Sequence, residues 1–187
     1  MRYMLALLCV LIPSVAIAGE NTVKKLESKF QDWNVEIILD GEKILYTTHG
    51  AQIHQRKLGF IQTVGNCRDI LHLEWSTWTE GTERFEGDLA GIAFKIGETS
   101  FTLNVRMLVS HSSIPMYRHM LFTNFAAGER LMDVFMKGKD ATISIQSPGE
   151  LVELIDPNWD NFSLQGFTAA QQKASELCQE LSVALTN

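Results

Sequence analysis

The sequence lacks the short motifs that mark the common catalytic centres. It has no His-Glu-x-x-His segment, and none of its 13 glycines flanks a serine in the Gly-x-Ser-x-Gly arrangement of hydrolases. No glycine-rich loop that would cradle a phosphate follows a predicted strand. We therefore predict no catalytic residue and no cofactor.

Clusters of basic residues are also missing. The chain has 16 Lys and Arg against 22 Asp and Glu, a formal net charge of −6, and contains no basic run. Binding to nucleic acid rests on neutralising phosphates, and attachment to anionic lipid requires the same kind of positive charge. The composition argues against both kinds of partner.

Long apolar runs are scarce, and the clearest one lies at the start of the chain. Arg2 precedes residues 5–18, which are almost wholly apolar and end in the small-x-small sequence Ala16-Ile17-Ala18. The run is shorter than the roughly 20 residues that a membrane-spanning helix needs, and it has the layout of a secretory signal peptide. We expect cleavage after Ala18 and no integral membrane segment. Residues 19–187 would then form a single β-rich domain in the periplasm or outside the cell.

Cysteine is rare, with three residues, of which Cys9 lies in the predicted signal. Cys67 and Cys178 remain, and two thiols in an oxidising compartment usually pair. Their bond would close a loop of about 110 residues and stabilise the fold by about 4–5 kcal/mol. The alternatives are two unlinked buried thiols, or a lipidated Cys9, although residues 6–8 lack the small side chains typical of that signal. No His or Cys stands at ligand spacing from either cysteine, so no metal site is predicted.

Alternating apolar and polar residues predict a mainly β protein with an antiparallel, sandwich-like domain. Asp40-Gly41 and Gly97-Glu98 are typical hairpin turns. Residues 81–87 are expected to form a loop, and residues 110–125 an irregular segment interrupted by Pro115. The predicted strands are residues 33–37, 43–48, 70–79, 92–96, 100–109, 141–146, 151–155 and 162–164. The predicted inward-facing side chains are Leu71, Leu73, Trp75 and Thr77 in strand 70–79, Phe94 and Ile96 in strand 92–96, and Phe101, Leu103 and Val105 in strand 100–109.

Helical spacing of apolar residues is found in three places. Residues 21–31 fit a short leading helix or a frayed terminus, and residues 127–136 a short helix with Gly138 as its C′ residue. The clearest helix starts at Thr168, which with Gln171 fits a capping box, and we expect it to pack on the sheet. Its apolar face comprises Ala170, Ala174, Leu177, Cys178, Leu181 and Leu185.

Two features are candidates for a binding surface. Trp78 stands on the polar face of its predicted strand, and Met116 and Tyr117 belong to the apolar segment 114–125. Packing into the core is the alternative for both, whereas an exposed aromatic patch would indicate a partner. Asp156 and Asp160 lie near a predicted turn and are expected to be solvated. The histidines are scattered, so no metal-binding set is predicted among His49, His54, His72, His111 and His119.

The last third of the chain resembles exported bacterial proteins of the invasion-associated locus B type. The shared layout is a short helix ending in Lys-Gly-Lys at 137–139, the alternating strand 141–146, and the segment 162–170 leading into a helix that reaches Cys178. Trp33-Asn34-Val35 also resembles an early strand of that family, but no cysteine follows it where such proteins often place one. The resemblance implies a β-sandwich-like fold, export and a non-enzymatic role, and it transfers no catalytic residue.

These observations favour a non-enzymatic periplasmic or secreted interaction protein that contacts a protein or a component of the cell envelope. A periplasmic inhibitor or immunity protein for a hydrolase or toxin is the first alternative. It would need a protruding loop or an acidic patch that fits a partner's cleft. A hydrolase is the second alternative, and it would need a concave pocket with converging His, Asp or Ser side chains.

Overall fold

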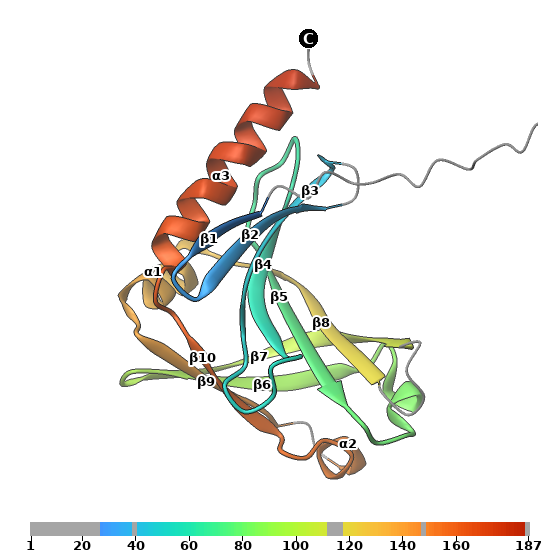
Figure 1. Cartoon of the computed structure of the whole chain (residues 1–187). Helices are drawn as coiled ribbons and strands as arrows, with labels where there is room; N and C mark the ends of the chain where they lie inside the picture. The colour runs from blue at the N-terminus through green and yellow to red at the C-terminus, as the bar shows by residue number, and fades with distance from the viewer. Residues whose placement is uncertain (1–26, 39–40, 112–117, 147–148, 186–187) are drawn as a thin grey trace, which may run out of the picture.

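A computed structural model describes residues 27–38, 41–111, 118–146 and 149–185, with the backbone alone at 27, 110, 111 and 118–125 (Figure 1). These residues form ten strands and three α-helices. The strands are β1 (Glu27–Phe30), β2 (Trp33–Ile38), β3 (Lys43–His49), β4 (Lys57–Thr63), β5 (Ile70–Thr77), β6 (Leu89–Ile96), β7 (Thr99–His111), β8 (Arg118–Ala126), β9 (Asp140–Ile145) and β10 (Trp159–Ser163). The helices are α1 (Glu129–Lys137), α2 (Glu150–Glu153) and α3 (Phe167–Ala184), with a 3₁₀ turn, η2 (Thr82–Phe85), before β6.

The strands pair antiparallel in the order β1-β2-β3-β4-β5-β8-β7-β6-β9-β10. Figure 1 shows that this order folds over into two layers, with β1 to β5 in one and β6, β7, β9 and β10 in the other. Strand β8 joins the layers because it pairs with β5 on one side and with β7 on the other. An isolated bridge between Gly50 and Phe162 brings β10 back to the end of β3. The predicted mainly β, sandwich-like fold is confirmed.

Aromatic side chains fill the space between the layers and the helices. Phe135 of α1 lies 5.3 Å from Phe60 of β4, ring centre to ring centre, and 5.5 Å from Phe167 of α3. At the other end, Trp75 of β5 and Phe162 of β10 approach to 6.4 Å. Such large side chains supply most of the apolar area that a core of this size buries. The core-facing prediction is confirmed for Leu71, Leu73, Trp75 and Thr77, all of which are buried.

Helix α3 lies across β1 to β4, as Figure 1 shows, and it begins one residue before the predicted start. Gly166 is its N-cap at φ 92°, a left-handed conformation in which a Cβ would collide with the backbone of Phe30. The predicted capping box is wrong: no side chain caps the helix, and Gln171 donates to Ser175 instead. The buried face comprises Phe167, Ala170, Ala174, Leu177 and Cys178, with Leu181 half-buried. The prediction that Leu185 belongs to the buried face is wrong, because Leu185 follows the last residue of α3 and is 75% exposed.

Four further expectations need correction. Glu27–Phe30 is a strand and not part of a helix, because a turn at Gln31 returns the chain into pairing with β2. The predicted strand 151–155 is wrong, because helix α2 occupies Glu150–Glu153 and buries Leu151, and Ile155 is buried in the turn that follows the helix. The predicted loop 81–87 contains η2. Gly138 is extended at φ −77° and not left-handed. A side chain there would collide with Ile96 and Leu164, so close packing explains this glycine.

Strands β4 and β8 are absent from the sequence-based prediction. In β4 the inward positions are Leu58, Phe60 and the polar Gln62, and Gly59 interrupts the opposite face. A Cβ at Gly59 would collide with the backbone carbonyl of Tyr46, so the neighbouring strand requires a glycine. Strand β8 carries the consecutive apolar run Met120-Leu121-Phe122, which gives no period-2 signal. Among the described residues, no helix is long and apolar enough to cross a bilayer.

Candidate functional site

A groove of about 420 Å³ lies between the first half of β7 and helix α1. From β7 it is lined by Thr99, Ser100, Phe101 and Leu103, and from the α1 side by Gly128, Arg130, Leu131 and Val134. Its apolar side chains are neither fully buried nor fully exposed. The layered fold leaves this apolar surface open at one end.

The local sequence explains why these side chains reach the groove. Phe101 and Leu103 have the same strand parity as Val105 and Met107, which are buried, so all four point to the inner side of β7. Phe101 stacks on the buried Phe94 with ring centres 5.1 Å apart. The predicted core assignment is therefore confirmed for Phe94, Ile96 and Val105. Phe101 and Leu103, by contrast, are only half-buried because they line the groove.

The charge of the groove is opposite in sign to that of the chain. The chain carries a formal net charge of −6, yet Arg130 is the one charged side chain among the described residues that line the groove. Arg130 is exposed and has no hydrogen-bond or ion-pair partner within the described parts of the chain. Its guanidinium is thus available to a carboxylate of a bound molecule.

A second polar cluster lies on the outer side of β3, β4 and β5. His72 Nε2 lies 2.9 Å from Glu74 Oε1, and Lys57 Nζ lies 3.1 Å from Glu74 Oε2. The rings of His49 and His54 stack at 4.1 Å. Burial lowers the pKa of His49, although the hydrogen bond to the His54 carbonyl partly opposes this change.

Among the side chains that the structure describes, His72 and Ser76 do not form the nucleophile–base pair of a hydrolytic centre. Ser76 is buried on the same face of β5 as His72, but four residues of strand separate them by about 13 Å. A nucleophile and its base must lie within hydrogen-bond reach, so this pair does not qualify. In the described ranges, no group of three His, Cys, Asp or Glu side chains is arranged to hold a metal ion. The side chains of His111 and His119 lie outside what the structure describes.

Glu74 makes the stability of the fold dependent on pH. Burial alone would raise its pKa, but the hydrogen bond from His72 and the charge of Lys57 outweigh burial and lower the pKa from 4.5 to about 2. The contribution of Glu74 to stability is therefore fully present above pH 4.5 and is lost as the pH falls toward 2. We expect Glu74→Gln to be less stable than wild type near neutral pH by on the order of 2 kcal/mol.

Urea unfolding at a series of pH values measures this difference, which should shrink below pH 4.5. Glu180→Gln, an exposed carboxylate on α3, is the matched control and should follow the wild-type curve. A stability difference between Glu74→Gln and wild type that persists unchanged into acid would contradict the assignment.

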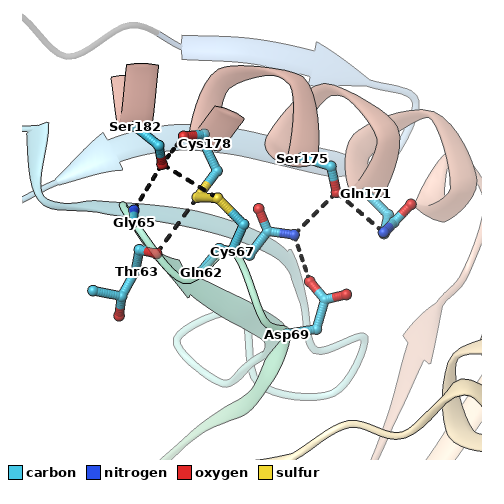
Figure 2. The surroundings of a disulfide bond; sticks show 9 residues. All are labelled: Gln62, Thr63, Gly65, Cys67, Asp69, Gln171, Ser175, Cys178 and Ser182. Atoms are coloured by element: carbon cyan, nitrogen blue, oxygen red, sulfur yellow. Dashed lines mark hydrogen bonds between the residues drawn. A yellow bond between two sulfur atoms is a disulfide. The ribbon is translucent and has the colours of Figure 1, made fainter. Parts of the chain in front are cut away.

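The predicted disulfide is present and fastens α3 to the β4–β5 turn. Cys67 and Cys178 are bonded with their Cα atoms 5.8 Å apart, within the usual range for a disulfide. Figure 2 shows that Ser182, one turn further along α3, accepts a hydrogen bond of 2.7 Å from the Gly65 amide. The turn is therefore tied to the helix by a covalent bond and by a hydrogen bond. The alternative of unlinked thiols is overturned.

A buried polar network extends from the disulfide toward the core. Gln62 donates from one amide nitrogen to Asp69 (2.7 Å) and to Ser175 of α3 (3.1 Å), as Figure 2 shows. Tyr46 donates to the same Asp69 oxygen at 2.6 Å. Burial raises the pKa of Tyr46 well above 10, and the charge of Asp69 and this hydrogen bond act in the same direction. The network therefore keeps the phenol protonated and links α3 to β3 and β4.

A buried ion pair between Arg56 and Asp160 holds β10 against the loop after β3. Arg56 is completely buried, lies 4.0 Å over the ring of Trp75, and donates to the carbonyls of Trp159 (3.0 Å) and Pro157 (2.7 Å). Asp160 lies 3.6 Å from Arg56 and accepts three backbone amides, those of Gln52, Ile53 and Asn161. The expectation that Asp160 is solvated is wrong, because the loop encloses it; Asp156 is exposed as expected.

Of the predicted surface residues the structure describes only Trp78, and Trp78 does not line the groove. Trp78 follows the end of β5 and is 59% exposed. Met116 and Tyr117 lie outside the described residues. Sequence reasoning missed the groove itself, which combines a strand and a helix separated in the chain. The signals available in the sequence were the expected inner face of the strand at residues 100–109 and the positive charge of Arg130 beside the apolar Leu131.

The chain matches no protein-family model and no curated protein. Its fold does have a counterpart among solved structures. It is similar to that of invasion associated protein B from Bartonella henselae. The TM-score is 0.52 at 11% identity, over 81% of this chain and 97% of that one. At this identity the likeness shows a shared fold alone. The resemblance drawn from the last third of the chain is confirmed at the level of the fold.

Proposed function

We propose that this chain is an exported, non-enzymatic interaction protein that binds a partner protein through the groove between β7 and α1. The observation that carries the proposal is the groove itself, an open apolar surface in a chain of net negative charge, where Arg130 is the one charged side chain among the described lining residues. Apolar surface that remains open on a folded domain is typical of sites for partners. A bound segment would cover Leu131 and Val134 and offer a carboxylate to Arg130.

Two further observations support export to the periplasm or the cell exterior. The first eighteen residues have the layout of a cleavable signal, and the Cys67–Cys178 disulfide is a bond that persists in oxidising compartments. The protein of similar fold is called an invasion associated protein, which agrees with a role in contacts between molecules. The proposed partner is a protein exposed in the same compartment or on the envelope.

Site-specific photocrosslinking in producing cells tests this function. A photoreactive amino acid at Leu131 should give a discrete adduct with one protein, whereas the same group at the exposed Gln172 of α3 should not. The purified partner should then bind Leu131→Gln at least roughly tenfold more weakly than wild type, and Gln172→Ala with wild-type affinity. The absence of an adduct specific to position 131, or equal affinities for wild type and Leu131→Gln, would refute the proposal.

A further inference from the structure

The groove is bordered by an open sheet edge. Strand β7 pairs with β6 from Thr99 to Arg106, but it pairs with β8 only from Arg106 to His111. Within the described residues, positions 99–105 of β7 therefore have a neighbouring strand on one side only. Figure 1 shows the β6–β7 hairpin extending away from β8. The backbone groups on the open side are available to an added strand.

The register identifies which backbone groups face the open side. Met107 exchanges hydrogen bonds with the chain before β6, donating to the Asp88 carbonyl and accepting from the Gly87 amide, both at 2.9 Å. In an antiparallel pair, successive residues direct their N–H and C=O groups alternately to the two sides. The backbone N–H and C=O groups of the odd-numbered residues of β7 therefore point toward β6. Those of Ser100, Thr102 and Asn104 point to the open side.

This edge lacks the protection found at the two end strands of the sheet. Strand β1 has only four residues, and two of them, Glu27 and Lys29, are charged. Strand β10 is covered by the bridge from Gly50 and by a hydrogen bond of 2.8 Å from the Ala51 amide to Asn161. Positions 99–105 of β7, Thr-Ser-Phe-Thr-Leu-Asn-Val, contain no charge and no proline. Proteins usually protect an open edge with charged residues or proline. An edge that lacks both and lies beside an apolar groove is a template for strand addition.

We propose that the partner binds as an extended segment that adds a strand to β7; this inference rests on the function proposed above. Its backbone would hydrogen-bond to Ser100, Thr102 and Asn104. Alternate apolar side chains would enter the groove, and a carboxylate would meet Arg130. A second copy of this chain does not fit as well, because residues 99–105 carry no acid to pair with Arg130.

A displayed library of random heptapeptides, selected on the disulfide-bonded domain, tests the inference. Enriched peptides should alternate apolar residues and carry Asp or Glu. Thr102→Pro should weaken their binding by roughly tenfold or more, since proline removes an open-side donor but no bond to β6. Thr102→Ala is the matched control and should bind normally. Arg130→Glu should weaken binding of the acidic peptides by about tenfold, and Glu near the helix N-terminus is itself compatible with α1.

The outcomes separate the binding mode from the function. If Thr102→Pro does not fold, peptides N-methylated at alternate backbone positions replace it, and methylation on one parity alone should abolish binding to the wild type. Strand addition would be refuted if peptide binding were weakened by Leu131→Gln but not by Thr102→Pro or by N-methylation of the peptide. The groove would then remain the binding site. Peptides indifferent to Leu131→Gln, or no enrichment at all, would refute both. A dimer formed through β7 and abolished by Thr102→Pro would show that the occupant is a second copy, and would overturn the proposed partner.

Discussion

Reduction of the Cys67–Cys178 bond is expected to lower the free energy of unfolding by about 4–5 kcal/mol at 25 °C. The bond spans 111 residues, and the entropy that a cross-link removes from the unfolded chain grows with the length of the loop it closes. The bond is also buried on the α3 side, where Cys178 has no exposed surface. Its loss should release the second half of α3 first, because Leu181 is only half-buried and Leu185 is exposed.

Urea unfolding of wild type with and without reductant measures this difference, and hydrogen exchange of the α3 amides locates it. The double variant Cys67→Ala/Cys178→Ala is the control. It should match the reduced wild type and be unaffected by reductant. Identical midpoints for the oxidised and reduced wild type would show that the bond does not constrain the unfolded chain in this way.

Arg56→Met is expected to destabilise the fold by about 3–5 kcal/mol, the usual cost of removing one partner from a buried ion pair. Methionine keeps an unbranched apolar side chain against Trp75, so the loss arises mainly from the guanidinium. The carbonyls of Pro157 and Trp159 lose their donor, and Asp160 keeps its charge in a completely buried position.

The same substitution at an exposed pair provides the control for Arg56→Met. Arg84 pairs with Glu150 and lies 4.9 Å over the ring of Phe85, but the side chains of the pair are 53% and 66% exposed. Arg84→Met should therefore change stability by less than about 1 kcal/mol. Thermal or urea unfolding compares the two variants directly. Equal effects for Arg56→Met and Arg84→Met would contradict the role of the buried pair.

The parts of the fold that could be predicted are those that depend on residues close together in the sequence. Asp40-Gly41 and Gly97-Glu98 specify hairpins within a few residues, and the structure has β2–β3 and β6–β7 as antiparallel pairs around them. The apolar face that places Cys178 on α3 also follows from helical spacing alone. The Cys67–Cys178 bond could be predicted because only two cysteines follow the apolar run at residues 5–18.

The missed elements depend on neighbours that are distant in the sequence. Strand β4 carries the inward polar Gln62, whose amide nitrogen donates to Asp69 and to Ser175 of α3, 113 residues away. The sequence predicts that Asp160 is a solvated carboxylate near a turn, whereas in the structure the loop containing Arg56 encloses it. The groove likewise requires Phe101 and Arg130 to be brought together by the return of the chain through β8. No local periodicity or motif in the sequence predicts such contacts between distant residues.

Five contacts that hold the C-terminal segment to the first layer share one property, which concerns the order in which the chain can fold. Each joins an early segment to residues 159–182, across separations of more than one hundred residues. They are Trp33–Ser163, Gly50–Phe162, Arg56–Asp160, Gly65–Ser182 and Cys67–Cys178. The ladder β1 to β5, by contrast, pairs strands adjacent in sequence and has little loop entropy to overcome. A nascent chain can therefore assemble its first layer early, but that layer remains uncovered until the C-terminal segment arrives, and during this interval the molecule is most exposed to aggregation.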